Sequence, residues 1–443
     1  MKTAHIFLLI VLAASSVAFC GENWPQWRGP NHNGSSGETG LPDKLDKDST
    51  LVWTTPLPGR SGATPVVWND KVFLTAGDKT NKDLLAICVN RADGKVLWQK
   101  VVAPSSDKPY GKNSNMASPS PITDGKSVIF LFGTGHLAAF DMDGKELWTR
   151  DLTKDHSKFA IMWGYGSSGM LYKDKLYIPV LQRDTNPYVP GADSGGKPIE
   201  SFILCIDPKT GKELWKHVRP SDAVQETRES YATPIPLELK DRSELVMVGG
   251  DCVSGHDPET GKEYWRFGGW NPTKINHVRL VPSVTTWQDL VFVSTPKHLF
   301  PFFAVKAGGS GDVTNSHQAW SLDKSISPDV CTPLVYKDLL YVLDGDSGKR
   351  MLYCIDPKTG TKKWEGQIPG AKSTFWTSPT AADDKIYVIN EASEVSVIQA
   401  GGSEFKVLNM TSMGDTICYS SIAIAQGQLF VRTGQNLHCF AKK

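Results

Sequence analysis

Aromatic, basic and acidic residues recur in the short loops that precede apolar stretches of this chain. Such a mixture can bind a ligand, because aromatic rings stack on flat groups, arginine binds anions, and a carboxylate acts as a base or a calcium ligand. The residues are Arg60, Asn113, Asn115, Trp163, Tyr165, Glu229, Tyr231, His277, Arg279, Asp329, Trp376, Asp415 and Tyr419. We expect them to converge near one axis, either as a small-molecule site or as the polar rim of a scaffold.

Motifs with a defined catalytic chemistry are missing from the sequence. There is no Gly-x-Ser-x-Gly turn for a serine hydrolase, and no His-x-His or His-Glu-x-x-His pair for a transition metal. Residues 164–169 match Gly-x-Gly-x-x-Gly, but a strand-like segment at 170–172 follows them and not the helix that a dinucleotide site requires. The sequence therefore predicts no catalytic residue and no metal ligand.

A repeated phrase predicts the elements that carry these loops. Asp-x-x-Thr-Gly followed by Trp occurs within 205–215, 255–265 and 354–364, and shorter copies end at residues 98, 148 and 405. Upstream of each copy, alternating apolar residues flank a tight polar turn such as Asn69-Asp70, which is typical of a β-hairpin. Glycine permits the positive φ of the later turn, and the Asp side chain can bond to nearby amides. Each unit is thus expected to be four antiparallel strands, one blade of a propeller.

The number and order of the units predict how the ring closes. The expected fourth-strand aromatics, which should dock between neighbouring blades, are Trp53, Trp98, Trp148, Trp215, Trp265, Trp320, Trp364 and Phe405. Trp53 precedes the first three-strand stretch, and no fourth strand follows the last stretch at 437–440. The sequence therefore predicts an all-β, eight-bladed β-propeller of four-stranded antiparallel blades, closed by an N-terminal strand that completes the last blade. A polar run at 183–197 is expected to be an inserted surface loop.

The N-terminal region has the pattern of an export signal. A short apolar run at 6–14 is followed by small residues, so residues 1–20 are expected to be a signal peptide, 21–50 an extension and 51–443 the propeller. Cys20 raises the alternative of an outer-membrane lipoprotein anchor, although Phe19 replaces the small residue such signals prefer. We expect a protein that is periplasmic or secreted after simple cleavage.

Composition and residue spacing argue against nucleic acid as a partner, against a membrane-spanning segment and against a disulfide framework. Lysine and arginine number 48 against 47 acidic residues, without a basic tract, which argues against nucleic-acid binding. No later apolar run is long enough to span a bilayer, and a monomeric propeller is expected. Cysteines at 88, 205, 354 and 439 share one register in separate blades, too far apart for disulfides, so they are expected to be buried thiols.

The phrase at 205–215 resembles the tryptophan-docking motif of the PQQ-like propeller family, with Cys205 where alanine is usual. The resemblance covers the repeat array and implies an eight-bladed ring in which tryptophans pack between blades. One copy departs from it, since Asp141 to Gly144 is a residue shorter than Asp207 to Gly211. The segment Trp24-Pro25-Gln26-Trp27-Arg28-Gly29 also looks like a lead-in of exported members, and its two rings must be covered by something.

The resemblance to that family leaves two functions open. Quinoprotein dehydrogenases hold pyrroloquinoline quinone (PQQ) and calcium on the axis, whereas members similar to the assembly lipoprotein BamB bind no cofactor and present loops to proteins. This chain has no adjacent cysteine pair and no Cys-x-x-Cys-His sequence, two features that the resemblance associates with the enzymes. We therefore predict a non-enzymatic binding or scaffolding module for a protein or polymer partner, without a cofactor. The alternative is a PQQ- and calcium-dependent dehydrogenase of sugars or alcohols.

Overall fold

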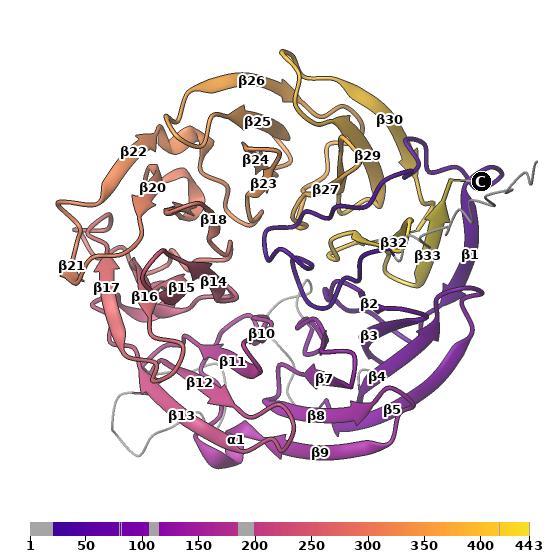
Figure 1. Cartoon of the computed structure of the whole chain (residues 1–443), viewed down its shortest axis with the longest axis horizontal. Coiled ribbons are helices and arrows are strands. Elements are labelled where there is room, and N and C mark those ends of the chain that lie inside the picture. Colours follow the sequence, from indigo (N-terminus) through magenta and orange to yellow (C-terminus); the bar gives the residue numbers. More distant parts are fainter. Residues whose placement is uncertain are drawn as a thin grey trace, which may run out of the picture.

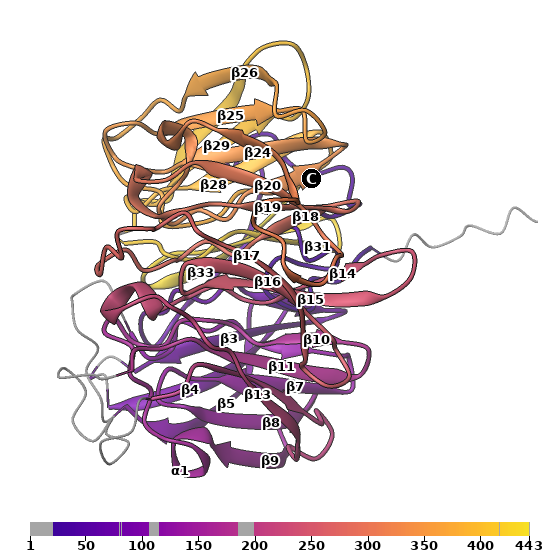
Figure 2. The ribbon, with the colours of Figure 1, turned by 90° about the vertical axis from the view of Figure 1, so that its left-hand side faces the viewer.

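Eight antiparallel β-sheets surround a central axis in the computed structural model, which describes residues 21–78, 80, 82–105, 115–184, 199–415 and 417–442 (Figure 1). The predicted eight-bladed propeller is confirmed. Seen from the side, the ring is a thick disc whose outer wall carries β17, Glu263–Phe267 (Figure 2). Within these ranges no helix has the length and apolar character needed to cross a membrane.

The blades are numbered in chain order, and the first strand of each lies nearest the axis. Blade 1 holds β2 (Val66–Trp68), β3 (Lys71–Gly77), β4 (Asp83–Asn90) and β5 (Val96–Pro104). Blade 2 holds β6 (Ile122–Thr123), β7 (Ser127–Leu131), β8 (His136–Asp141) and β9 (Glu146–Asp151). Blade 3 holds β10 (Met170–Tyr172), β11 (Lys175–Val180), β12 (Phe202–Ile206) and β13 (Glu213–Val218). Blade 4 holds β14 (Ile235–Glu238), β15 (Ser243–Gly249), β16 (Cys252–His256) and β17.

The second half of the ring repeats this order. Blade 5 holds β18 (Thr285–Trp287), β19 (Leu290–Val293), β20 (Phe302–Lys306) and β22 (Gln318–Leu322). Blade 6 holds β23 (Leu334–Tyr336), β24 (Leu339–Asp344), β25 (Met351–Ile355) and β26 (Lys362–Gln367). Blade 7 holds β27 (Thr380–Ala382), β28 (Lys385–Ile389), β29 (Glu394–Gln399) and β30 (Val407–Ser412). Blade 8 holds β31 (Ala423–Ala425), β32 (Gln428–Arg432), β33 (Asn436–Ala441) and β1 (Leu51–Pro56). The short helices are α1 (Leu152–Asp155), η1 (Gln225–Arg228), η2 (Pro296–His298) and η3 (Lys324–Ile326).

Blade 8 joins the two ends of the propeller. Strand β1 pairs antiparallel with β33, so that Trp53 lies opposite Cys439 and Thr54 opposite His438. The indole N–H of Trp53 then donates to the carbonyl of Arg91 in blade 1, at 2.8 Å. The predicted closure by an N-terminal strand is confirmed, and apolar side chains of blades 7, 8 and 1 share one core cluster across the seam.

Tight turns connect the two innermost strands of each blade. In blades 6 and 7 both central turn residues have positive φ, at Lys337 (50°) and Asp338 (56°) and at Asp383 (51°) and Asp384 (60°). Turns of this kind match the right-handed twist of the strands that they join. The polar turn residues therefore produce the hairpins that the sequence predicts.

The Asp-x-x-Thr-Gly turn is fixed by its own side chains. Asp207 accepts the amide N–H of Lys209 (2.9 Å) and the hydroxyl of Thr210 (2.8 Å), and Gly211 has a φ of 72°. A Cβ on Gly211 would lie 2.6 Å from the ring of Trp148 in the preceding blade. Glycine is needed here both for the backbone conformation and for the close approach of the indole.

Most of the fourth-strand aromatics contact the next blade. In four cases the indole N–H donates to a backbone carbonyl of the next blade. The pairs are Trp98 to Met142 (3.2 Å), Trp148 to Pro208 (2.9 Å), Trp320 to Pro357 (3.1 Å) and Trp364 to Gly401 (3.0 Å). The ring of Trp98 also lies between Phe73 of its own blade and Phe140 of blade 2. The indole N–H of Trp215 is buried without a partner among the described residues, and Phe405 packs against Trp364 at 5.8 Å.

Trp265 departs from the expected docking between blades. Its ring is fully buried, and its N–H donates to Glu244 of β15, in the same sheet, at 2.7 Å. Beside β17 lies a fifth strand, β21 (Gly311–Asp312), which pairs with it in parallel. This strand comes from the segment between β20 and β22 and covers the outer edge of blade 4 with backbone, while the indole N–H of Trp265 bonds within its own sheet.

All seven cysteines after Cys20 are buried free thiols. Burial raises the pKa of Cys88 and Cys205 to about 12, so these side chains stay protonated near neutral pH. The expectation of buried thiols in place of a disulfide framework is confirmed.

We predict that protonation of His256 destabilises the protein in acid. Its ring is buried between the hydroxyl of Ser254 (2.8 Å) and the carbonyl of Gly261 (3.0 Å), and burial lowers its pKa to about 3. The unfolded histidine titrates near 6.5, so between about pH 6.5 and 3 the unfolded state binds the extra proton. Stability should fall by roughly 1.4 kcal/mol per pH unit across this window. Urea unfolding at several pH values should show a shallower acid slope for His256→Asn, while the exposed His277→Asn keeps the wild-type slope.

Candidate functional site

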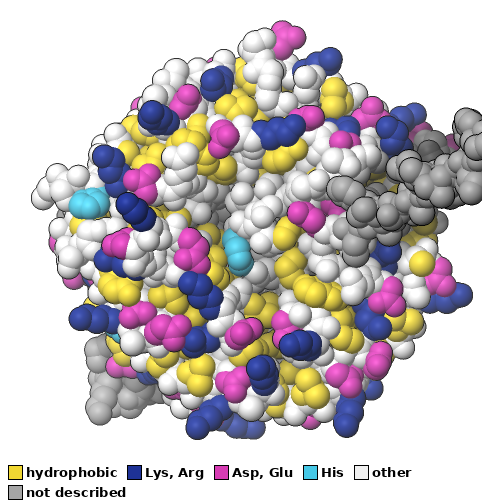
Figure 3. Space-filling view, viewed as in Figure 1, with side chains coloured by type: hydrophobic (Ala, Val, Ile, Leu, Met, Phe, Trp, Pro, Cys, Tyr) yellow, Lys and Arg dark blue, Asp and Glu magenta, His cyan; other side chains and the backbone are white. Residues whose placement is uncertain are grey.

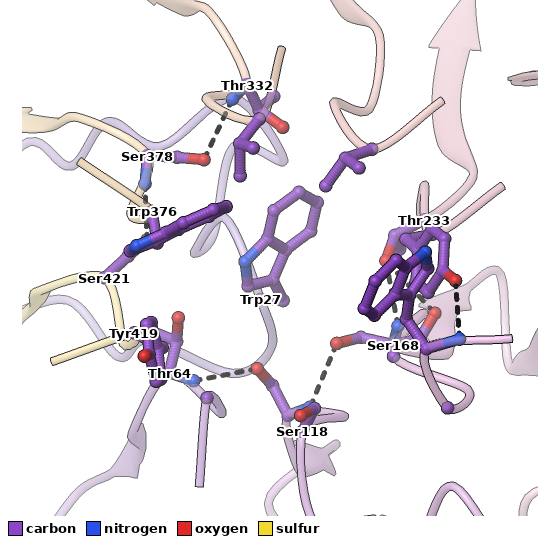
Figure 4. A pocket seen from close by; sticks show the side chains of 18 of the residues that line it. Trp27, Thr64, Ser118, Ser168, Thr233, Thr332, Trp376, Ser378, Tyr419 and Ser421 are labelled. Atoms are coloured by element: carbon purple, nitrogen blue, oxygen red, sulfur yellow. Dashed lines mark hydrogen bonds between the residues drawn. The ribbon is translucent and has the colours of Figure 1, made fainter. Parts of the chain in front are cut away.

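A cavity of about 540 Å³ lies on the propeller axis and receives residues from all around the ring (Figure 4). Its volume is within the range of small-ligand sites. The lining residues are Trp27, Gly62, Thr64, Ser118, Ser120, Trp163, Gly164, Gly166, Ser168, Tyr231, Thr233, Arg279, Val281, Val330, Thr332, Trp376, Ser378, Tyr419 and Ser421. Aromatic rings and small hydroxyl side chains thus dominate its wall.

One serine or threonine per blade forms a hydrogen-bonded ring around this axis, which we call the hydroxyl ring. Its members are Thr64, Ser120, Ser168, Thr233, Ser283, Thr332, Ser378 and Ser421. In seven successive pairs the backbone N–H of one member donates to the hydroxyl oxygen of the next, at 2.8–3.1 Å. At the seam the hydroxyl of Ser420 donates to the carbonyl of Ala63, at 2.8 Å. These bonds hold the innermost strands of adjacent blades at one spacing.

The extension at residues 21–50 closes one end of the axis. In Figure 1 this indigo segment crosses the face of the ring toward its centre, and charges of both signs are interspersed on the same face in Figure 3. Trp27 reaches the middle of the cavity (Figure 4). The contacts with blades 1, 2 and 3 are the Trp24–Val67 backbone pair (2.9 and 2.8 Å), Thr123 N–H to Pro25 O (2.9 Å) and Leu171 N–H to Gln26 Oε1 (2.9 Å).

These contacts lie at the hairpin-turn ends of the innermost strands, where Asn69 N–H also donates to the side chain of Asn23, at 2.7 Å. The loops that carry the predicted site residues lie at the other ends of those strands. The cavity therefore has a floor at Trp27 and a mouth among these loops, which we call the axial rim (Arg60, Asn115, Trp163, Glu229, His277, Arg279, Asp329, Trp376 and Tyr419).

Arg28 ties the extension to the opposite side of the ring. Its buried guanidinium donates to the carbonyls of Pro333 (3.0 Å) in blade 6, Pro379 (2.8 Å) in blade 7 and Asn33 (2.6 Å) in the extension. A Cβ on Gly34 would lie 2.3 Å from this guanidinium, so only glycine fits at position 34. Burial lowers the pKa of Arg28 to about 9. One side chain thus joins the extension to two blades.

We predict that Arg28→Met lowers the free energy of unfolding by about 3 kcal/mol, because three carbonyl oxygens lose a charged donor in a buried place. Urea unfolding at pH 7 measures the effect. Arg60→Met is the matched control, since Arg60 is exposed on the axial rim, and it should stay within about 0.5 kcal/mol of the wild type. Equal stabilities for the two variants would mean that Arg28 does not hold the extension in place.

Arg279 is the one cation among the described residues that line the cavity. Its Nη1 lies 3.3 Å from Oδ1 of Asp329, and its Nε lies 3.7 Å from Oε1 of Glu226. Glu226 also accepts the indole N–H of Trp163, at 3.1 Å. The guanidinium is therefore shared between two carboxylates, and little of its positive charge is left for an anionic ligand.

Glu229 lies behind the wall of the cavity. Its buried carboxylate bonds to the guanidinium of Arg183 and accepts the hydroxyl of Tyr231 (3.0 Å) and the amide of Met162 (3.2 Å). Burial raises the pKa of Glu229, and the charge of Arg183 opposes that shift. Burial and the neighbouring carboxylate raise the pKa of Tyr231. These bonds position the Tyr231 ring and the loop that carries Trp163.

The structure brings only part of the predicted set into the cavity. Trp163, Tyr231, Arg279, Trp376 and Tyr419 line it, while Glu229 and Asp329 bond to lining residues. The hydroxyl of Tyr419 donates to Glu391 (3.0 Å), and its ring meets Trp376 edge-on at 6.2 Å.

The other predicted residues do not reach the cavity. Tyr165 is buried in the core, and its hydroxyl donates to Pro179 at 2.7 Å, so its expected axial position is wrong. Arg60 and His277 are exposed on the rim, and Asn115 accepts the amide of Ala117 within its own loop (2.9 Å). The side chain of Asp415 accepts hydrogen bonds from Thr433, Gln435 and Asn436 of blade 8. Asn113, Cys20 and most of the polar run at 183–197 lie outside the described residues.

Among the described residues no aspartate or glutamate lines the cavity, so its wall offers calcium no carboxylate ligand. Nowhere in the described ranges do three His, Cys, Asp or Glu side chains group as metal ligands. Glu229, the buried axial carboxylate, is engaged by Arg183 and Tyr231.

Two parts of the site go beyond what the sequence predicts. For Trp27 the sequence indicates only a ring that needs cover. The hydroxyl ring has a readable signal, since Ser or Thr precedes proline at the start of five innermost strands, at residues 64, 120, 233, 332 and 378. Proline at the strand start has no N–H to leave unpaired, and the hydroxyl before it can bridge to the next blade.

A family model for the outer membrane protein assembly factor BamB matches residues 44–162 and 200–443. The chain belongs to the BamB family. BamB of Shewanella oneidensis is 24% identical to it over 364 residues, which cover 76% of this chain and 84% of that protein. The match spans the ring on both sides of the polar run in blade 3.

Solved structures share the fold at low sequence identity. BamB from Moraxella catarrhalis has a TM-score of 0.59 and 14% identity, over 89% of this chain and 99% of that one. The quinohemoprotein alcohol dehydrogenase of Comamonas testosteroni has a TM-score of 0.67 and 12% identity, over 94% and 80%. A europium-containing methanol dehydrogenase reaches 0.68 with 9% identity, over 95% and 98%. Since BamB and enzymes share this fold, the site has to decide the function.

Proposed function

We propose that this BamB-family chain is an exported, non-enzymatic scaffold whose axial rim binds a protein partner, and that it serves outer membrane protein assembly. The observation that carries the proposal is the family match on both sides of the polar run, from residue 44 to residue 443. The name of that family concerns assembly of other proteins, and a rigid closed ring with loops on one face suits such a role.

The chemistry of the rim supports binding over catalysis. Its acids are engaged, Glu229 by Arg183 and Asp329 by Arg279, and among the described residues neither has a free basic partner for proton transfer. The aromatic rings of Trp163, Trp376 and Tyr419 remain at the mouth as contact surface. Tryptophan and tyrosine are the residues that most often anchor protein interfaces. We propose that the protein works without a cofactor.

Export follows from the same proposal. Residues 1–20 would direct the chain across the inner membrane, and the mature protein would be a monomer in the periplasm or outside the cell. Simple cleavage is favoured over a lipid anchor because Phe19 precedes Cys20. Cys20→Ala should therefore leave the partition between membrane and soluble fractions unchanged, whereas palmitate labelling at Cys20 would establish an anchor.

Site-specific photo-crosslinking in the cells that make the protein tests the partner. A photoreactive residue at His277, which is exposed on the axial rim, should give an adduct with one defined polypeptide. The matched control is Lys100, which is exposed on the outer strand β5 and should not give that adduct. Equal adducts at both positions would contradict a rim-specific partner. Dye reduction by the purified chain with PQQ and calcium would favour the dehydrogenase alternative.

A further inference from the structure

The cavity described above has an unusual balance of hydrogen-bonding groups. Each hydroxyl of the ring that accepts a neighbouring N–H still has its own O–H to donate. For Ser120, Ser168 and Ser378 the described chain supplies no acceptor for that hydrogen, and it supplies no partner for the hydroxyl of Thr64. The indole N–H of Trp376 is buried away from the cavity, so this residue offers the cavity its ring and not a donor. The wall therefore offers unused donors.

The acceptors at the mouth are already taken. Glu226 binds Trp163 and Arg279, Glu229 binds Tyr231, and Glu391 binds Tyr419. Arg279 is neutralised by its two carboxylates, so an anion would find no free cation in the described wall. The complementary ligand is uncharged, carries carbonyl oxygens and has few N–H groups of its own.

Aromatic rings set the shape of that ligand. Figure 4 shows Trp27 in the middle of the cavity, with Trp376 on one side and Ser168 and Thr233 on the other. Flat rings next to donors are the combination that binds polyproline II segments, since pyrrolidine rings pack on aromatic faces and proline carbonyls accept hydrogen bonds. Such a segment also lacks the N–H groups that the cavity could not satisfy.

We propose that the axial cavity binds a proline-rich, uncharged segment of the protein partner. Since Trp27 closes the far end, the segment enters from the axial rim and rests on this ring. The proposal deepens the proposed function and rests on it. It assigns to the cavity a peptide ligand, to Thr64 the role of a hydrogen-bond donor to its carbonyls, and to Trp376 that of an aromatic contact.

Calorimetry and tryptophan fluorescence on the full chain test the proposal with a blocked octaproline peptide. We expect one site, about tenfold weaker binding for Trp376→Ala, and a smaller loss for Trp376→Phe, which keeps an aromatic ring against the peptide. Thr64→Val is the sharpest variant, because no hydrogen bond of the described chain uses the Thr64 hydroxyl. It should weaken octaproline severalfold without shifting the melting temperature.

Matched controls show whether octaproline binds in this cavity. Trp287→Ala removes a tryptophan at the hairpin-turn end of β18 that does not line the cavity and whose N–H bonds to Asp338 of blade 6, so octaproline affinity should stay within about twofold. A blocked octapeptide of glycine and serine should not bind. Absence of octaproline binding, affinity unchanged in both Trp376→Ala and Thr64→Val, or binding of PQQ or cellobiose in this cavity instead would overturn the proposal. The photo-crosslinking at His277 can be repeated in the Trp376→Ala variant. If the adduct with the partner still forms there, the scaffold function stands and the assignment of the cavity to a peptide is wrong.

Discussion

Deletion of residues 21–56 is expected to lower the free energy of unfolding by about 5 kcal/mol or more, because it removes both the extension and the strand that closes the ring. Without β1, strand β33 loses its outer partner along residues 436–440, and the core cluster of blade 8 loses Trp53. The exposed edge would also favour association between molecules. Thermal unfolding and light scattering measure the two effects.

Deletion of residues 21–50 alone is the matched control, since it retains β1. It should lose the Arg28 contacts, the Trp27 floor and the side chains of Trp24, Leu41 and Leu45 in the seam cluster, but keep the pairing of β1 with β33. Hydrogen exchange distinguishes the two variants, because amides of residues 436–440, which face β1, should lose protection only when β1 is absent. Equal protection in both variants would show that β1 does not seal the ring.

Trp265→Ala is expected to cost about 4 kcal/mol, the range for deleting a fully buried aromatic side chain. The effect should be large because the ring is completely buried and its N–H donates to Glu244, which is also fully buried. Removing the indole leaves a cavity and a carboxylate that depends on Arg242 alone. Urea unfolding provides the measurement.

Two variants bracket this result. Trp265→Phe keeps most of the volume and loses only the hydrogen bond, so it should fall between the wild type and Trp265→Ala. Trp287→Ala, at a partly exposed ring of blade 5, should cost less than about 1 kcal/mol. A wild-type melting curve for Trp265→Ala would mean that the ring is not packed as the structure has it.

The fold could be predicted from the sequence because its signals are local and repeated. The turn chemistry of Asp207 and Gly211 marks the fourth strand of a blade, and the number and order of the eight expected fourth-strand aromatics predict how the ring closes. Trp265 shows the limit of that reasoning. Its phrase has Gly255 where Cys205 and Cys354 stand in the other copies, and a Cβ on Gly255 would lie 2.3 Å from the indole nitrogen of Trp265. That substitution was the signal for a ring turned into its own sheet.

The site was harder to predict because it depends on distances around the whole ring. Loop position alone could not separate Tyr231, which lines the cavity, from Tyr165, whose ring packs in the core. Whether Glu229 is free or engaged depends on Arg183, which reaches it from another loop. Trp27 comes from a segment with no repeat pattern, so no periodicity could place it on the axis.

The pairing of β1 with β33 has a consequence for the order in which the protein is made. Strand β1 is synthesised before all other strands and can pair only after β33 has been synthesised. The other blades are made in between. Such a long-range contact forms slowly and only in a complete chain. A polypeptide that lacks β33 therefore keeps an open toroid, and we expect proteases to cut it more readily than the closed ring.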